Sequence, residues 1–158
     1  MPSRDPDVRK LALTIFAANS QLLHAGNQLV AHLGLSSAWW QVLTALRASE
    51  APLTTAGLSR KMGLSRQAVQ RIVDLLELHD LVKLQPNARH QRAKLVVLTE
   101  AGFAAVGRAE RAVGPIDKVI ADRLGAERIR NAINTLEELN DVIAGNLAAE
   151  VEKLSKKG

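Results

Sequence analysis

Two helices separated by one glycine turn constrain the fold of this 158-residue chain more than any other feature. Thr54 can cap the first helix, because its hydroxyl accepts a hydrogen bond from a backbone N–H that has no helical partner. Gly63 can end that helix, since glycine adopts the left-handed conformation at a helix C-terminus at little cost. Ser65 can then cap a second helix, which we expect from Arg66 to about His79. The spacing predicts a helix-turn-helix unit.

A β-hairpin is expected directly after the second helix. Residues 81–84 form a short apolar run, residues 86–92 are polar turn residues, and residues 95–98 are aliphatic or β-branched. Basic side chains cluster at the tip of this hairpin. The pattern predicts a mainly α protein with a small β-hairpin wing, in which a winged helix-turn-helix head is joined to a helical region.

The exposed face of the second helix carries the residue types that read duplex DNA. Arginine can bond both acceptors of guanine in the major groove, and glutamine can bond adenine in the same two-point way. A serine cap and the free N–H groups beside it can hold a phosphate, while basic residues on the hairpin can enter a minor groove. The predicted DNA-binding residues are Ser65, Arg66, Gln67, Gln70, Arg71, Arg89, Arg92 and Lys94.

The charge of the chain is concentrated in the same region. The formal net charge is +5, and residues 57–100 hold eight Lys or Arg against four Asp or Glu, an excess of +4. This local basic footprint favours a polyanion as partner. Aromatic residues make up only 3% of the chain, which argues against stacking platforms for single-stranded nucleic acid.

The first helix is expected from about Asp7 to Leu33 and carries a wide apolar face. Val8, Ile15, Leu22 and Leu29 recur on it every seven residues, with further apolar residues alongside. A helix with so broad an apolar arc usually has neighbours on two sides, which in a small chain indicates a partner subunit. The alternative is a core helix of a monomer.

Three further helices are expected around the head. One follows Ser36 or Ser37 and ends near Ala48, one begins at about Glu100, and one begins near Ala126. Either Ser36 or Ser37 can cap the first of them, and Thr99 can cap the second. Gly114-Pro115 should break or kink that second helix, because proline lacks the N–H that the helix interior needs.

The head region is similar to a known protein family. Leu53 to Gly102, LTTAGLSRKMGLSRQAVQRIVDLLELHDLVKLQPNARHQRAKLVVLTEAG, resembles the DNA-binding region of the multiple-antibiotic-resistance regulator (MarR) family, and Leu33 to Leu46, LGLSSAWWQVLTAL, resembles its second helix. The resemblance implies a homodimeric transcription factor whose first and last helices interlock and whose heads bind pseudo-palindromic operators. It implies a DNA-binding domain at residues 36–102 and a dimerisation region at residues 1–35 and 103–158.

The resemblance extends to single positions, with two departures. The stretch from Ser65 to Arg71 matches the start of the family's recognition helix, and Arg92 matches its wing-tip arginine. His90-Gln91 stands where the family usually has Asp-Arg, so the ion pair of that aspartate cannot form in the same way. Asp80 stands where the family has glycine, and aspartate tolerates the left-handed conformation better than most residues.

A pocket for a small molecule between the dimer helices and the head is also implied by the resemblance. Trp40 continues an apolar stripe and is expected in the core. Trp39 points elsewhere, so we predict that an aromatic or phenolic effector contacts Trp39, His32 and Arg47. His24 and His32 lie on one helix about 12 Å apart, too far to share one metal ion.

The expected function is that of a DNA-binding transcriptional regulator, a repressor more than an activator, which responds to a small-molecule effector. We find no convergent acid, base or nucleophile and no phosphate-binding glycine loop, so we expect no enzyme, no metal and no cofactor. No apolar run reaches the roughly 18 residues of a membrane span, so we expect a cytoplasmic protein without a membrane partner. The alternative is a helical dimer whose winged head binds another protein, and a second is a DNA binder without an effector.

Overall fold

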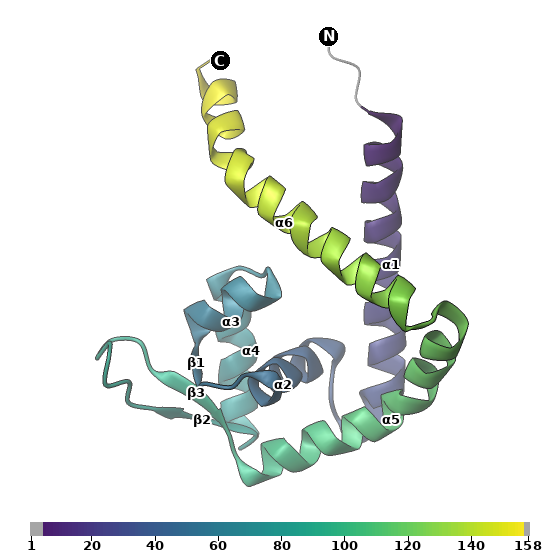
Figure 1. Ribbon diagram of the computed structural model, residues 1–158. Coiled ribbons are helices and arrows are strands. Elements are labelled where there is room, and N and C mark those ends of the chain that lie inside the picture. Colours follow the sequence, from purple (N-terminus) through teal and green to yellow (C-terminus); the bar gives the residue numbers. More distant parts are fainter. Residues whose placement is uncertain (1–4, 157–158) are drawn as a thin grey trace. The chain divides into compact units, whose positions relative to one another are not determined.

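The computed structural model describes residues 5–156 (Figure 1). In chain order its elements are α1 (Pro6–Val30), the 3-10 turn η1 (Ala31–Leu33), α2 (Ser37–Ala48), β1 (Leu53–Thr54), α3 (Thr55–Met62), α4 (Arg66–Leu78), β2 (Val82–Gln85), β3 (Leu95–Leu98), α5 (Glu100–Leu124) and α6 (Ala126–Ser155). The chain divides into two compact units, one ending at Gly114 and the other beginning at Pro115. The mainly α fold with a winged helix-turn-helix head is confirmed.

Side-chain caps start the helices of the head where the sequence predicts them. Thr54 Oγ1 accepts from Gly57 N at 3.1 Å at the start of α3, and Ser65 Oγ accepts from Ala68 N at 3.1 Å at the start of α4. Of the two candidates for α2, Ser36 is the cap, with its Oγ 3.2 Å from Trp39 N. Each such cap stabilises its helix by about 1 kcal/mol.

Ser37 has a different role from the cap beside it. Its backbone N–H donates to Asn27 Oδ1 of α1 at 2.7 Å, and its side chain lies over Gly26 of α1. A Cβ added at Gly26 would come within 2.8 Å of Ser37 Oγ, so α1 and α2 approach too closely there for any larger residue. This contact joins the C-terminal part of α1 to the head.

Left-handed residues follow two helices of the head, α3 and α4. Gly63 ends α3 at φ +65°, as the sequence predicts. Asp80 follows α4 at φ +57° and is the one residue other than glycine with positive φ among those described. The prediction that Asp80 takes over the family's glycine conformation is therefore confirmed, and Leu81 N bonds back to Leu76 O at 2.9 Å to close the turn.

The wing belongs to a sheet of three strands in the order β1-β3-β2, all antiparallel. The predicted hairpin is present as β2 and β3, with Val82 opposite Leu98 and Gln85 opposite Leu95. The sequence prediction missed the third strand, β1, which pairs Leu53 with Val96. A strand of two residues has no periodicity to recognise, and its hydrogen bonds to β3 exist only after the chain has folded.

The core of the head is formed by aliphatic side chains from α2, α3, α4, the sheet and the first half of α5, together with Val30 of α1. Leu43, Leu58 and Leu76 are the largest fully buried ones. Gly102 shows how tightly α5 docks, since a Cβ at this position would overlap the carbonyl oxygen of Leu81.

The long helix α5 bears on one prediction. Gly114-Pro115 was expected to break or kink it; the helix is not broken, because it continues through Pro115 to Leu124, and a kink at this point stays a prediction. The proline removes one internal N–H without ending the helix, because the residues on both sides keep helical conformation. The boundary between the two compact units nevertheless falls at this point.

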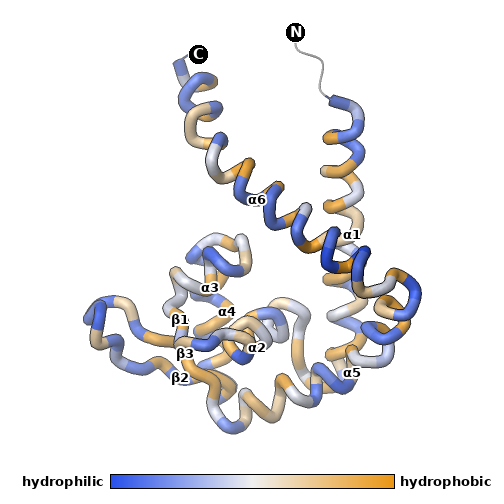
Figure 2. Tube along the Cα trace, in the orientation of Figure 1, coloured by the Kyte–Doolittle hydropathy of each residue, from blue (hydrophilic) through white to orange (hydrophobic). Residues whose placement is uncertain are grey.

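Two helices leave their apolar side chains exposed. Figure 2 shows hydrophobic residues recurring along both α1 and α6. On α1, Phe16 is 69% and Leu22 66% exposed, and on α6 no residue is buried. Within residues 5–156 no single helix is long and apolar enough to cross a membrane, and only Pro6–Leu33 taken with Ser37–Ala48, a pair bent by 87°, reaches that length and composition.

Candidate nucleic-acid interface

The turn between α3 and α4 places the start of α4 on the surface. Ser59 holds this turn from both of its polar groups: its carbonyl accepts from Leu64 N at 3.2 Å and its hydroxyl donates to Leu64 O at 2.6 Å. Ser65 then caps α4 through Ala68 N. The N–H groups of the first turn lack intrahelical acceptors, so the exposed N-terminus of α4 is suited to hold an anion such as a phosphate.

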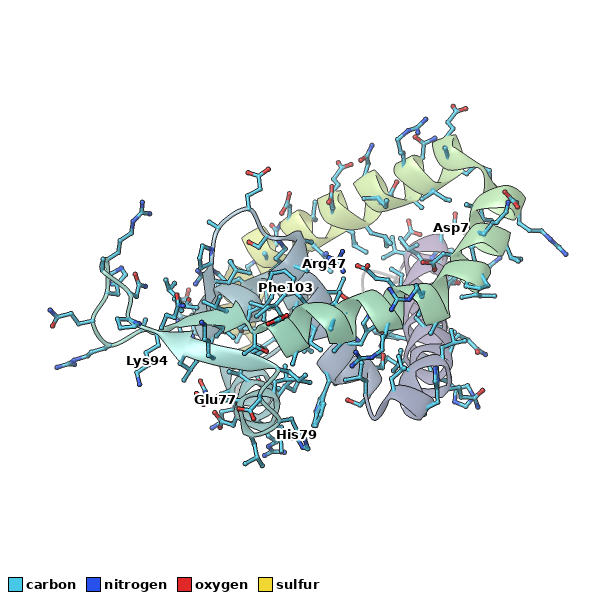
Figure 3. The ribbon with its side chains drawn as sticks, turned by 90° about the horizontal axis from the view of Figure 1, so that it is seen from below. Asp7, Arg47, Glu77, His79, Lys94 and Phe103 are labelled. Carbon is cyan, nitrogen blue, oxygen red and sulfur yellow. The ribbon has the colours of Figure 1, made fainter. Side chains whose placement is uncertain are left out.

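A concavity of about 450 Å³ lies between the first turns of α4 and the hairpin. It brings together five of the predicted DNA-binding residues: Arg66, Gln67, Gln70, Arg92 and Lys94. Figure 3 shows Lys94 at the base of the hairpin loop, where the loop joins β3. Residues separated by more than 20 positions in the sequence thus share one surface.

The charge of this surface is positive. Arg66, Arg92 and Lys94 line the concavity, and no Asp or Glu is among its lining residues. None of these three cations takes part in the ion pairs formed among residues 5–156. Their charges are therefore available to an outside anion without an internal carboxylate having to be displaced.

The other three predicted residues lie beside the concavity. Ser65 is the cap of α4, and Arg71 is exposed further along the same helix. Arg89 lies in the hairpin loop, where its backbone N–H donates to Asn87 Oδ1 at 3.0 Å. The loop is further shaped by the bonds from His90 N to Asn87 O at 3.2 Å and from Ala93 N to His90 O at 3.1 Å. Backbone turns thus order the segment that differs from the family's Asp-Arg-Arg.

Sequence analysis missed part of the lining. The additional residues are Thr54, Thr55, Ala56, Leu84 and Ala93. The start of α3 reaches the concavity because β1 pairs with β3 and holds it beside the hairpin. Because the sequence pattern did not predict β1, it could not predict that the start of α3 lines the concavity.

The three predicted effector residues have separate surroundings. Trp39 lies against His79 at the end of α4, with ring centroids 4.9 Å apart. Arg47 Nη1 forms an ion pair with Glu110 Oε2 of α5 at 3.0 Å, and His32 is exposed in η1. Arg47 and His79 both lie outside the hairpin (Figure 3). His32, Trp39 and Arg47 line neither the concavity beside α4 nor two further cavities of about 220 and 350 Å³.

A cavity lies instead beside the other tryptophan. It has about 350 Å³ and is lined by side chains of α2 and the end of α3, among them Trp40, Thr44, Lys61 and Met62. Trp40 Nε1 and Thr44 Oγ1 are buried without a hydrogen-bond partner among residues 5–156. Trp40 also packs against the core, as predicted. Within the same residues no group of three or more His, Asp or Glu is placed to hold a metal ion.

The capped α3–α4 pair, the three-stranded sheet and the basic hairpin beside α4 define a winged helix-turn-helix protein. The family model described as "MarR family" matches residues 33–93, which cover α2 to the hairpin loop. This part of the chain is therefore similar to the MarR family.

Curated relatives match a smaller part of the chain. Uncharacterized proteins of Mycobacterium bovis and Mycobacterium tuberculosis are 32% identical over 96 residues, covering 61% of this chain and 66% of their own length. The chain thus spans just under two thirds of these curated relatives.

Two solved structures share the fold. An Escherichia coli mutant MarR complexed with operator DNA has a TM-score of 0.71 at 23% identity, covering 86% of this chain and 99% of that one. CouR of Rhodococcus jostii RHA1 bound to p-coumaroyl-CoA has a TM-score of 0.71 at 21% identity, covering 82% and 90%. At these identities the likeness establishes the fold.

Proposed function

We propose that this chain is a transcriptional regulator that binds a pseudo-palindromic operator in duplex DNA as a homodimer. The observation that carries the proposal is the concavity in which Arg66, Arg92 and Lys94 meet Gln67 and Gln70 without an acidic lining residue. The E. coli MarR structure that shares this fold holds operator DNA, which supports the same class of partner here.

In this proposal α4 enters the major groove with its N-terminal end. Gln67, Gln70 and Arg66 face base edges, because glutamine and arginine offer the paired hydrogen bonds that single base pairs require. Ser65 and the free N–H groups of the first turn bind a phosphate and set the register. Arg92, on the wing, enters the adjacent minor groove, where the negative potential is strong over A·T stretches.

The homodimer supplies the second half-site. We propose that residues 1–35 and 103–158 form the dimerisation region and residues 36–102 the DNA-binding domain. The exposed apolar side chains of α1 and α6 support a second copy as the occupant, since such surface is costly to leave in water. The two copies of α4 then have to lie about 34–36 Å apart to occupy successive major grooves.

A small aromatic or phenolic effector modulates binding in this proposal, and repression arises because the operator-bound dimer blocks polymerase. An effector that prefers a head separation unsuited to DNA shifts the population away from the operator. A tenfold loss of affinity needs a differential binding free energy of about 1.4 kcal/mol. The CouR structure, which holds p-coumaroyl-CoA, supports an aromatic ligand, and the cavity beside Trp40 has room for an aromatic ring.

The decisive experiment is fluorescence anisotropy on two labelled duplexes at about 150 mM salt, where non-specific affinity is typically only 10⁻⁴–10⁻⁶ M. One duplex is the chain's own upstream intergenic DNA, and the other is its scrambled sequence. We expect nanomolar binding to the native duplex, with a steep loss as salt rises. Equal weak binding to both, or binding that does not respond to salt, contradicts operator recognition and favours the head as a protein-interaction module.

The effector is tested on the same protein by titrating benzoate, 4-hydroxybenzoate and p-coumaroyl-CoA while recording tryptophan fluorescence and operator affinity. Trp39→Phe and Trp40→Phe separate the two candidate positions. A response lost only in Trp39→Phe places the ligand beside Trp39, and one lost only in Trp40→Phe places it in the cavity of α2 and α3. Unchanged fluorescence and unchanged operator affinity with all three compounds contradict an effector of this class.

A further inference from the structure

One side-chain hydrogen bond on α4 links the concavity to a residue outside it. Gln70 Nε2 donates to Asp74 Oδ1 at 2.7 Å, one helical turn further along. Gln70 lines the concavity, whereas Asp74 is exposed and is not among the lining residues. The bond therefore couples a predicted base-contacting side chain to a carboxylate outside the concavity.

The chemistry of the two groups determines how the amide of Gln70 is turned. An ionised carboxylate only accepts hydrogen bonds, whereas a primary amide carries two N–H donors at one end and an acceptor oxygen at the other. Turned the other way, Gln70 would direct its oxygen at Asp74 and the two acceptors would repel each other. Asp74 consequently selects the orientation with the nitrogen toward itself.

This orientation leaves one N–H and the amide oxygen of Gln70 for a partner in the concavity. Adenine presents an acceptor, N7, and a donor, N6–H₂, side by side in the major groove, and a donor and acceptor held together match that pair. We propose that Asp74 is a positioning residue that fixes the amide of Gln70 for adenine and so sets base preference at one operator position. The inference rests on the proposed DNA-binding function.

The carboxylate of Asp74 also lowers the affinity for DNA. A negative charge on the helix that faces DNA is repelled by the phosphates, so Asp74 weakens binding to every sequence. By restraining Gln70, Asp74 increases the difference in affinity between the preferred sequence and other sequences, and this difference is the specificity. Replacing the carboxylate is therefore expected to move affinity and base preference in opposite directions.

The experiment uses full-length wild-type protein and variants to select binding sites from a randomised duplex library, followed by anisotropy on the selected site and its single-base variants. Gln70→Ala first identifies the position that Gln70 reads. Asp74→Asn removes the charge at nearly constant shape and lets the amide turn either way, because asparagine both donates and accepts. Asp74→Glu keeps a carboxylate that only accepts. Glu77→Gln makes the same charge change elsewhere on α4 and is the matched control.

We expect Asp74→Asn to reduce adenine preference at that position by about tenfold, the range lost with one two-point base contact, while binding to unrelated duplexes tightens. Combining it with Gln70→Ala adds no further loss of preference, because the two side chains act as one unit. Asp74→Glu retains the preference, and Glu77→Gln leaves it within twofold of wild type. Thermal unfolding followed by circular dichroism checks that each variant is folded.

Two results overturn the inference while the proposed function stands. One is an Asp74→Asn variant whose affinity changes by the same factor for all sequences, which makes Asp74 only a charge on the helix surface. The other is a Gln70→Ala variant with the base preferences of wild type. Failure of the proposed function is distinct, because wild-type protein would then select no sequence from the library at all, and the inference would fall with it.

Discussion

Apolar side chains are buried in the head but exposed to solvent on α1 and α6. In the head, aliphatic residues from several elements bury one another, and Leu43, Leu58 and Leu76 are fully buried. On α1 and α6 residues of the same chemical type remain open, with Phe16 69% and Leu154 72% exposed. The head therefore buries its apolar surface within one protomer, while α1 and α6 each leave apolar surface exposed to solvent.

The first prediction tests the self-sufficiency of the head and carries the largest expected effect. Leu58→Ala should lower the free energy of unfolding by about 2–5 kcal/mol, because it leaves a cavity in a core that cannot fully collapse. Urea denaturation at several protein concentrations measures the change. The loss should be the same at each concentration, and a loss that depends on concentration would show that Leu58 acts through assembly.

The second prediction tests the opposite region. Phe16→Asp on α1 should weaken the proposed dimer by about 2 kcal/mol, or roughly 30-fold, because that dimer is proposed to bury the apolar ring that is lost. Sedimentation equilibrium measures the dissociation constant, and operator affinity should fall with it. Gln21→Asp adds the same charge on α1 at an exposed position about 140° around the helix from Phe16 and is the control. Equal sedimentation of Phe16→Asp and wild type would remove α1 from the dimer interface.

The third prediction concerns the helix side of the DNA-binding surface. Gln67→Ala should relax base preference at one or two operator positions, at a cost of about 1–3 kcal/mol for the preferred base. Anisotropy on single-base operator variants measures the change. A uniform loss over all sequences would instead mean that Gln67 only contacts the backbone.

The fourth prediction concerns the wing. Arg92→Ala should weaken binding to all sequences by about tenfold and make the slope of log affinity against log salt shallower by up to about one unit if a phosphate contact is lost with it. The slope is measured between 50 and 200 mM salt. Arg130→Ala, an exposed arginine on α6, provides the control. Unchanged affinity would show that the wing with His90-Gln91 has no part in binding.

The fifth prediction carries the smallest effect and returns to the packing of the head. Asp80 holds φ +57° after α4, so Asp80→Gly should raise the free energy of unfolding by up to about 1 kcal/mol, since glycine adopts this conformation without steric cost. Asp141→Gly inside α6, where the backbone is helical, should lower it instead. Urea denaturation distinguishes the two, and a decrease at Asp80 would show that its side chain makes a contact worth more than the strain.

Much of the head was predictable because its signals are local. Thr54, Ser65 and Gly63 act within one helical turn of their own positions, so a cap or a left-handed stop can be recognised before the chain folds. The same holds for the exposed side of α4, where Arg66, Gln67 and Gln70 follow from helical spacing. The choice between Ser36 and Ser37 was not local, because it depended on Asn27 of α1 binding the N–H of Ser37.

The candidate sites likewise combine properties that are local to the sequence with properties that depend on the tertiary structure. The sequence by itself determined which residues can bind DNA, since hydrogen-bonding capacity and charge are properties of the side chains. Only the tertiary structure decided that five of them share one concavity, because α4 packs against β2 and so lies beside the loop that joins β2 to β3. It likewise placed Trp39 against His79 and Arg47 against Glu110. Contacts between distant segments depend on packing of the whole core, so the sequence pattern of a single segment cannot predict them.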